Sequence, residues 1–267
     1  MKSLASVSLA DVQSVYSGAE GDLWRLIMGE QIHIGGLTSS MDLAGQADIQ
    51  AGSSGVDLCC CSGAGMRFLV RFRNVARMTG VDATAHVIEQ GRGASAAEGL
   101  ASRITFVQAE VTRSGLADAS ADFAWGEDAW CYVADKQKLI AEAARIVRPG
   151  GTIAFTDWVE GPAGLTDAEA ERFLRFMKFP SFADIADYAG LLRQNNCTVL
   201  AANDTGRFAA AIDLYLNMLN MQLTYDALKI IGFDQQMMAS LAGEMIFAQQ
   251  LAHDRKIIQG IFVARKT

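Results

Sequence analysis

One stretch of the chain, Val56–Val70 (VDLCCCSGAGMRFLV), most constrains what the chain can fold into. Its apolar start predicts a buried strand, Ser62–Gly65 predicts a tight turn, and the residues from Met66 onward predict a helix. A strand, a glycine turn and a helix in this order form the unit with which α/β proteins bind nucleotides, because glycine lets the backbone approach the ligand closely. Three consecutive cysteines stand where glycines are expected in such a unit, so a metal or redox site is the alternative.

Strands and helices alternate along the middle of the chain. Predicted strands lie at 56–60, 76–82, 104–108, 121–126 and 152–158, and predicted helices at 66–74, 84–100 and 135–147. This alternation favours an α/β fold with a parallel sheet and right-handed crossovers. Two further strands are predicted at 197–204 and 260–266.

The two ends of the chain are predicted to be helical. Ser8–Asp11 has the pattern of a capping box, as does Thr166 with Glu169, and a second capped helix is expected from Ser181. A Met-rich helical stretch follows, from about Ala209 to Gln259. We therefore expect a single domain with a helical lead or lid at 1–50, a cofactor-binding core at 51–160, and a helical cap with the last two strands at 161–267.

Composition and charge limit the classes of function. Hydrophobic residues make up 51% of 267 residues, and the net charge is −7 without a basic run, which argues against a nucleic-acid partner. The first residues lack the apolar stretch of a signal peptide, and no segment approaches the roughly 20 apolar residues of a membrane span. An odd count of five cysteines, three of them adjacent, does not suit a disulfide framework. The sequence predicts a cytoplasmic protein that acts on a small molecule.

Candidate ligand-binding residues follow the predicted strands. Gly63 and Gly65 form the turn, Asp82 ends the second strand about 20 residues later, and Glu110 follows the third strand. An acidic residue at the place of Asp82 can accept hydrogen bonds from ribose hydroxyls. Three consecutive strand residues point to alternate faces, and no second cysteine–histidine cluster accompanies Cys59–Cys61, so no metal is expected.

Several motifs together resemble the small-molecule branch of the class I S-adenosylmethionine-dependent methyltransferases. They are the acidic-x-Gly-x-Gly-x-Gly-like segment Asp57–Gly63, GVDAT, QAEV, SADFAWGEDAW, RIVRPGGTIAFTDW and QGIFVARK. The segment YSGAEGDLWRLIMGEQIHIGG is similar to sarcosine/dimethylglycine N-methyltransferases. The resemblance implies a Rossmann-like, seven-stranded, mostly parallel sheet with helices on both faces and an antiparallel last strand.

The resemblance also implies S-adenosyl-L-methionine as the cofactor and a set of residues that bind it. Gly63, Gly65 and Asp57 would lie along its methionine part, and Tyr16 would close over it. The other implied contacts are Asp82 to the ribose, Glu110 and the Val111 N–H to adenine, and the Glu127 backbone to the methionine tail. Cys59 and Cys61 stand where the family usually has glycine, and cysteine is not expected to adopt the backbone conformations that glycine can.

The expected chemistry is an in-line displacement, in which positioning and exclusion of water provide much of the catalysis. His33 and Asp157 are candidate bases, with a loop histidine and a capping carboxylate as the alternatives. Trp24, Trp130 and Tyr132 could form an aromatic surface for a methylated cation, or could pack the core.

The prediction is methyl transfer to a small acceptor, with an amine nitrogen favoured over carbon or sulfur. Two alternatives stay open: a non-catalytic S-adenosylmethionine-binding protein, and an NAD-dependent oxidoreductase, since Gly63-Ala64-Gly65 also begins a dinucleotide fingerprint. Phe68 stands where the third glycine of that fingerprint would be. The apolar C-terminal helices could support a homodimer.

Overall fold

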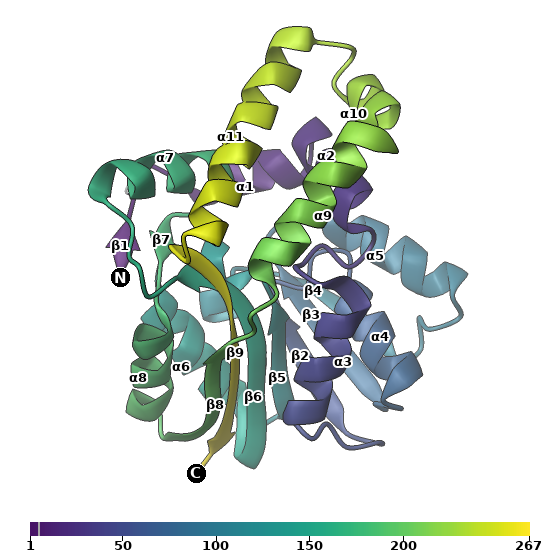
Figure 1. Cartoon of the computed structure of the whole chain (residues 1–267). Helices are drawn as coiled ribbons and strands as arrows, with labels where there is room; N and C mark the ends of the chain where they lie inside the picture. The colour runs from purple at the N-terminus through teal and green to yellow at the C-terminus, as the bar shows by residue number, and fades with distance from the viewer. Residues whose placement is uncertain (5) are drawn as a thin grey trace.

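A seven-stranded sheet forms the centre of the protein (Figure 1). The structure is a computed structural model and describes residues 1–4 and 6–267. The strand order is β4-β3-β2-β5-β6-β9-β8, and β9 runs antiparallel to both of its neighbours. The strands are β2 (Ser54–Leu58), β3 (Arg77–Asp82), β4 (Ile104–Gln108), β5 (Ala121–Glu127), β6 (Val147–Glu160), β8 (Cys197–Asp204) and β9 (Ile257–Lys266). The predicted Rossmann-like fold with an antiparallel last strand is confirmed.

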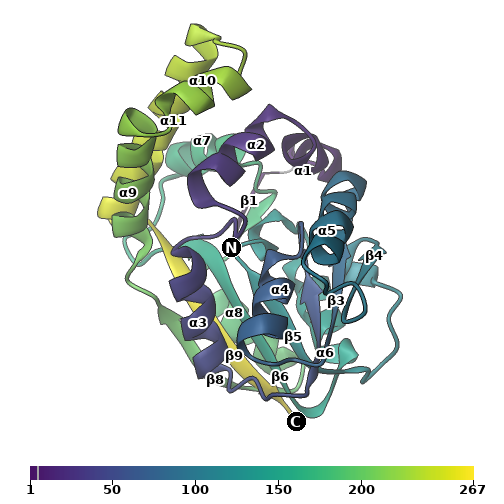
Figure 2. The ribbon, with the colours of Figure 1, turned by 90° about the vertical axis from the view of Figure 1, so that its right-hand side faces the viewer.

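Helices cover both faces of the sheet, as the nearly continuous apolar runs of its central strands require. On one face lie α3 (Gly36–Gln46), α4 (Ala64–Phe72) and α5 (Ala85–Ala97), in front of the sheet in Figure 2. On the other lie α6 (Lys136–Ile146) and α8 (Ile185–Gln194). Leu69 and Phe123 belong to the core on the first face, and Leu139 and Tyr188 to the core on the second.

A helical layer stands above the carboxyl ends of the parallel strands (Figure 1). It contains α1 (Leu9–Tyr16), α2 (Ala19–Met28), α7 (Asp167–Met177), α9 (Phe208–Met221), α10 (Thr224–Ile230) and α11 (Gln235–His253). The capping boxes predicted at Ser8 and Thr166 are present. No helix of the described residues is long and apolar enough to cross a membrane.

Two predicted boundaries are wrong. Ser181 does not begin a helix, because its hydroxyl donates to the carbonyls of Val133 and Ala134. Instead Ser181–Phe182 forms β7, which pairs with β1 (Lys2–Ser3), and Asp184 caps α8. The long Met-rich stretch is three helices and ends at His253, because residues 257–259 join β9 and pair with β6.

Candidate active site

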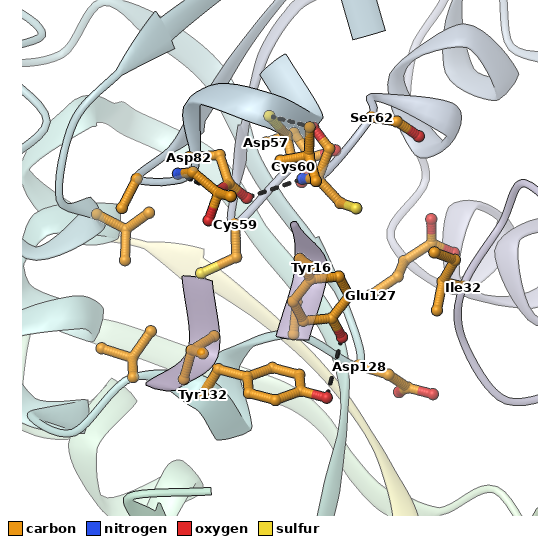
Figure 3. A pocket seen from close by; sticks show the side chains of 18 of the residues that line it. Tyr16, Ile32, Asp57, Cys59, Cys60, Ser62, Asp82, Glu127, Asp128 and Tyr132 are labelled. Atoms are coloured by element: carbon orange, nitrogen blue, oxygen red, sulfur yellow. Dashed lines mark hydrogen bonds between the residues drawn. The ribbon is translucent and has the colours of Figure 1, made fainter. Parts of the chain in front are cut away.

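A pocket of about 190 Å³ opens at the carboxyl ends of β2, β3 and β5, beneath α1 (Figure 3). It brings together residues from segments that lie far apart in the sequence. The predicted site residues that line it are Tyr16, His33, Asp57, Cys59, Gly65, Asp82, Glu110, Val111, Glu127 and Tyr132. Gly63, Trp24, Trp130 and Asp157 do not line it.

Asp82 organises the loop that follows β2. Its carboxylate accepts hydrogen bonds from the backbone N–H groups of Cys61 (3.0 Å) and Thr84 (2.8 Å). The same side chain faces the pocket, and burial raises its pKa (Figure 3). One carboxylate therefore holds the turn after β2 and the start of α5 in place.

The two glycines of the turn are required for different reasons. Gly63 has a φ of +74° and caps α4, and a Cβ there would come within 2.8 Å of Met66 and Phe106. Gly63 is thus a turn residue. It was expected to lie along the cofactor, but it does not line the pocket. Gly65 does line the pocket, and a Cβ there would lie 2.7 Å from Oε2 of Glu127.

Cys59 and Cys61 adopt left-handed backbone conformations, with φ of +65° and +48°. The expectation that cysteine would not adopt the conformations of glycine here is wrong, since both residues have left-handed conformations at positions where glycine is usual in the family that the sequence resembles. Burial raises the pKa of the Cys61 thiol to about 12, so the thiol is protonated at neutral pH. All five cysteines are free, and His, Cys, Asp and Glu side chains form no metal-binding cluster within the described part of the chain.

We expect Cys61→Gly to stabilise the protein. A left-handed conformation costs a residue with a Cβ about 1–2 kcal/mol, whereas the extra freedom of glycine in the unfolded chain costs about 0.4–1 kcal/mol. The unfolding free energy should therefore rise by roughly 0.5–1 kcal/mol in guanidinium titrations under reducing conditions. Cys61→Ala, which keeps the strain, is the matched control, and equal stability of the two variants would contradict this explanation.

Glu127 and His33 meet in a buried polar network that includes Ser40. Oε1 of Glu127 accepts from the Ser40 hydroxyl (2.6 Å) and lies 3.3 Å from Nε2 of His33, while Oε2 accepts from Trp125 Nε1 (3.0 Å). The Ser40 oxygen in turn accepts from Nε2 of Gln31 (3.0 Å) and lies 3.2 Å from Nε2 of His33. Because Ser40 gives its one proton to Glu127, Nε2 of His33 must be the donor in both contacts.

Asp128 is a pocket residue that the sequence reasoning missed, although it stands beside Glu127 in WGEDAW. Its carboxylate accepts from the Ile34 N–H (2.7 Å) and from Nε2 of Gln259 (2.8 and 3.0 Å). Burial raises its pKa, and the nearby His33 opposes that shift. Ser40 was also missed, because it lies 87 residues from Glu127 and belongs to no recognisable motif.

Tyr16 and Tyr132 form an aromatic wall of the pocket. Their rings stand edge to face with centroids 5.5 Å apart, and the Tyr16 hydroxyl donates to that of Tyr132 (2.9 Å; Figure 3). The ring of Tyr132 also packs edge to face on Phe179, at 4.9 Å. Burial raises the pKa of both phenols well above the ordinary value, so both are neutral.

Three predicted site residues have other positions. Trp130 is fully buried, donates from Nε1 to the Leu58 carbonyl (3.0 Å) and stacks on Phe155 at 4.0 Å, so it packs the core. Trp24 lies in a separate cleft of the helical layer. Asp157 is fully buried and accepts from the Cys131 N–H (3.0 Å) and the Tyr188 hydroxyl (2.6 Å), which makes it structural.

Asp157 predicts a pH dependence of stability. Burial raises its pKa from 3.8 to about 6, although the Lys136 ammonium opposes the shift. The folded state therefore binds a proton that the unfolded chain releases, and this contribution to stability is lost as the pH rises through 6. From about pH 5 to about 7.5, the unfolding free energy should fall by on the order of 1 kcal/mol relative to that of Asp157→Asn. Parallel pH profiles in urea titrations would contradict the assignment.

The comparisons with known proteins agree with this geometry. Residues 56–155 match the family model described as a methyltransferase domain. The chain is 30% identical over 132 residues to 27-O-demethylrifamycin SV methyltransferase of Amycolatopsis mediterranei. The aligned segment covers 49% of this chain and 48% of that protein. It is 42% identical over 59 residues to dimethylglycine N-methyltransferase of Parasynechococcus marenigrum, over 22% of this chain and 21% of that protein. The matched segments thus span about half or less of these relatives.

A solved structure extends the likeness in fold to almost the whole chain. The putative sarcosine dimethylglycine methyltransferase of Galdieria sulphuraria superposes with a TM-score of 0.79 at 20% identity, over 93% of this chain and 98% of that chain. The matched family model covers β2 to β6, the part of the sheet that carries the pocket. Residues 56–155 thus match a methyltransferase domain, and the whole chain has the fold of a small-molecule methyltransferase.

Proposed function

We propose that the chain transfers the methyl group of S-adenosylmethionine to the amine nitrogen of a small acceptor that carries no carboxylate or phosphate. The charge of the pocket carries this proposal. Among residues 1–4 and 6–267, no lysine or arginine lines it, whereas six carboxylates do: Glu30, Asp57, Asp82, Glu110, Glu127 and Asp128. Such a field favours a cationic amine over an anionic acceptor.

The residues at the turn fit the cofactor. The Asp57 side chain is 4% exposed, and no described residue donates a hydrogen bond to it. An unpaired buried carboxylate is costly, and burial together with the charges of Glu127 and Asp82 raises its pKa well above the ordinary value. An ammonium group from the methionine part of the cofactor would supply the missing partner. Gly65 leaves the space beside Asp57 that this part needs.

The other cofactor contacts are proposed from position. Asp82 would accept from the ribose hydroxyls, as the free side of its carboxylate faces the pocket. Glu110 and the Val111 N–H, at the start of the 3₁₀ turn after β4, would receive the adenine ring. Cys59 would contact the cofactor through its pocket-facing surface, and Glu127 through its backbone, because its side chain is held by Ser40 and Trp125.

The remaining part of the pocket would hold the acceptor. The neutral faces of Tyr16 and Tyr132 can stabilise a methylammonium group by cation–π attraction and keep water away from the transferred methyl group. The Asp128 carboxylate would attract the amine. His33 would position this part of the pocket, because its Nε2 donates to Ser40 and Glu127 and its Nδ1 lies 3.4 Å from the Ile34 carbonyl oxygen. The amine would react in its neutral form, with its proton passed to the Asp128 carboxylate, whose pKa burial raises.

The acceptor atom is the part of the proposal that most needs a test, since matching proteins carry the names of O-, N- and C-methyltransferases. Three acceptors with one apolar body separate the nucleophiles: phenethylamine, 4-ethylphenol and 2-phenylethanethiol. We expect the amine to be methylated with a kcat/KM about tenfold or more above the others. Faster methylation of the phenol or thiol would contradict the proposal.

A variant of Asp128 links that selectivity to the pocket. Asp128→Asn should lower kcat/KM for phenethylamine by about tenfold, the loss expected for one charge-assisted hydrogen bond. Its affinity for S-adenosylhomocysteine should not change. Asp226→Asn, on the exposed side of α10, is the matched control.

The cytoplasmic location and the homodimer stay predictions.

A further inference from the structure

A second cleft, of about 70 Å³, lies in the helical layer, away from the cofactor pocket. Its floor is made of buried apolar side chains from α2 and α11, namely Leu23, Trp24, Ile27 and Met245. Asn220 and Ala242 stand exposed at its rim, so solvent reaches it. Apolar voids of this size are uncommon in close-packed interiors, and their walls lack the contacts that a ligand would provide.

One charged side chain, Glu20, is present at this cleft. It lies in the first turn of α2 and is half-buried, and burial raises its pKa. Within the described residues no donor forms a hydrogen bond or an ion pair with its carboxylate. Lys178, whose charge acts on Glu20, donates instead to the Arg175 carbonyl (3.2 Å). Glu20 thus borders an apolar cleft and has no hydrogen-bond or ion-pair partner within the described residues.

We propose that this cleft is a second ligand site, which takes a small amphipathic amine with its apolar part between α2 and α11 and its ammonium group at Glu20. Apolar walls and a single carboxylate at one side are the two features that such a molecule recognises. Phosphate or carboxylate ligands are excluded by the same carboxylate. The site does not depend on the proposed reaction, because none of its lining residues lines the cofactor pocket.

The position of the cleft gives it a route to the reaction site. Three residues of α2, Leu23, Trp24 and Ile27, line the cleft. The segment Glu30–His33, which follows α2, lines the cofactor pocket. A ligand that packs on α2 therefore contacts the element that leads into the loop of His33.

The test uses the full chain and calorimetric titration with n-hexylamine, n-hexanol and hexanoate. We expect saturable binding of hexylamine, with an affinity about tenfold or more above those of the other two, as one charge-assisted hydrogen bond provides. Glu20→Gln should remove this preference and leave the affinity for hexanol unchanged. Ala242→Phe places a ring at the rim and should abolish binding. Ala239→Phe, exposed one turn earlier on α11 and outside the cleft, is the matched control.

The outcomes separate the possible sites. Hexylamine that binds in the acidic cofactor pocket would be unaffected by Ala242→Phe, so unchanged binding to that variant would overturn the proposal. Equal affinities for hexylamine and hexanol would also overturn it, since Glu20 would then recognise nothing. Because only binding is measured, a failure of methyl transfer would leave this result intact.

Discussion

Replacing Asp82 with alanine is expected to weaken the binding of S-adenosylhomocysteine by on the order of 100-fold or more, since the two charge-assisted hydrogen bonds that we propose to the ribose would be lost. The variant also removes the acceptor of the Cys61 and Thr84 N–H groups, which loosens the turn beside the cofactor. Both effects act in the same direction, and calorimetric titration measures their sum.

The control for this variant is Asp226→Ala, which removes an exposed carboxylate of α10 and should leave the affinity unchanged. Circular dichroism establishes that each variant is folded. An Asp82→Ala protein that is folded and binds within about threefold of the wild type would show that neither the loop nor the ribose depends on this carboxylate.

Trp130→Ala is expected to lower the unfolding free energy by about 3–5 kcal/mol, the usual cost of truncating a fully buried tryptophan. The side chain fills the space against Phe155 and satisfies the Leu58 carbonyl, so truncation leaves both a cavity and an unpaired acceptor. Trp130→Phe keeps the stacking and should cost about 1–3 kcal/mol for the carbonyl alone.

This prediction decides between the two roles considered for Trp130. If the residue packs the core, the loss appears in urea titrations, and KM for the acceptor in Trp130→Phe is unchanged. Phe72→Ala, at a residue that is 58% exposed, should change stability by about 0.5 kcal/mol or less. An unaltered unfolding curve with a strongly raised KM would instead place Trp130 in the acceptor wall.

The sheet could be predicted from the sequence because its strands are apolar runs with turn residues between them. The middle of β6 is continuously buried, and the capping boxes at Ser8 and Thr166 mark helices by their own local hydrogen bonds. Ser181 has a similar local pattern, but contacts with Val133 and Ala134, nearly 50 residues away, decide its conformation. Local patterns cannot show such contacts.

The positions of the residues that we propose for the cofactor could also be predicted, because these residues follow strand ends. The positions of those that we propose for the acceptor could not. Asp128 has a φ of +51°, and the turn it makes directs Trp130 into the core while Tyr132 reaches the pocket. The Asp157 side chain lies on the face of the sheet that α6 and α8 cover, where one of its oxygens accepts a hydrogen bond from the Tyr188 hydroxyl. The spacing of these residues along the chain does not reveal toward which side of the sheet, core or pocket their side chains point.

The central claim is that an acidic pocket without a lysine or arginine among its described lining residues selects an amine acceptor that has no anionic group. The most direct measurement offers labelled S-adenosylmethionine to equal concentrations of tryptamine and tryptophan in one tube, and counts the label in each product. The two acceptors differ in one carboxylate, so their ratio reports the charge of the pocket. Label in methylated tryptamine, with little or none in tryptophan, is the result we predict; equal labelling, or a preference for tryptophan, would contradict the account.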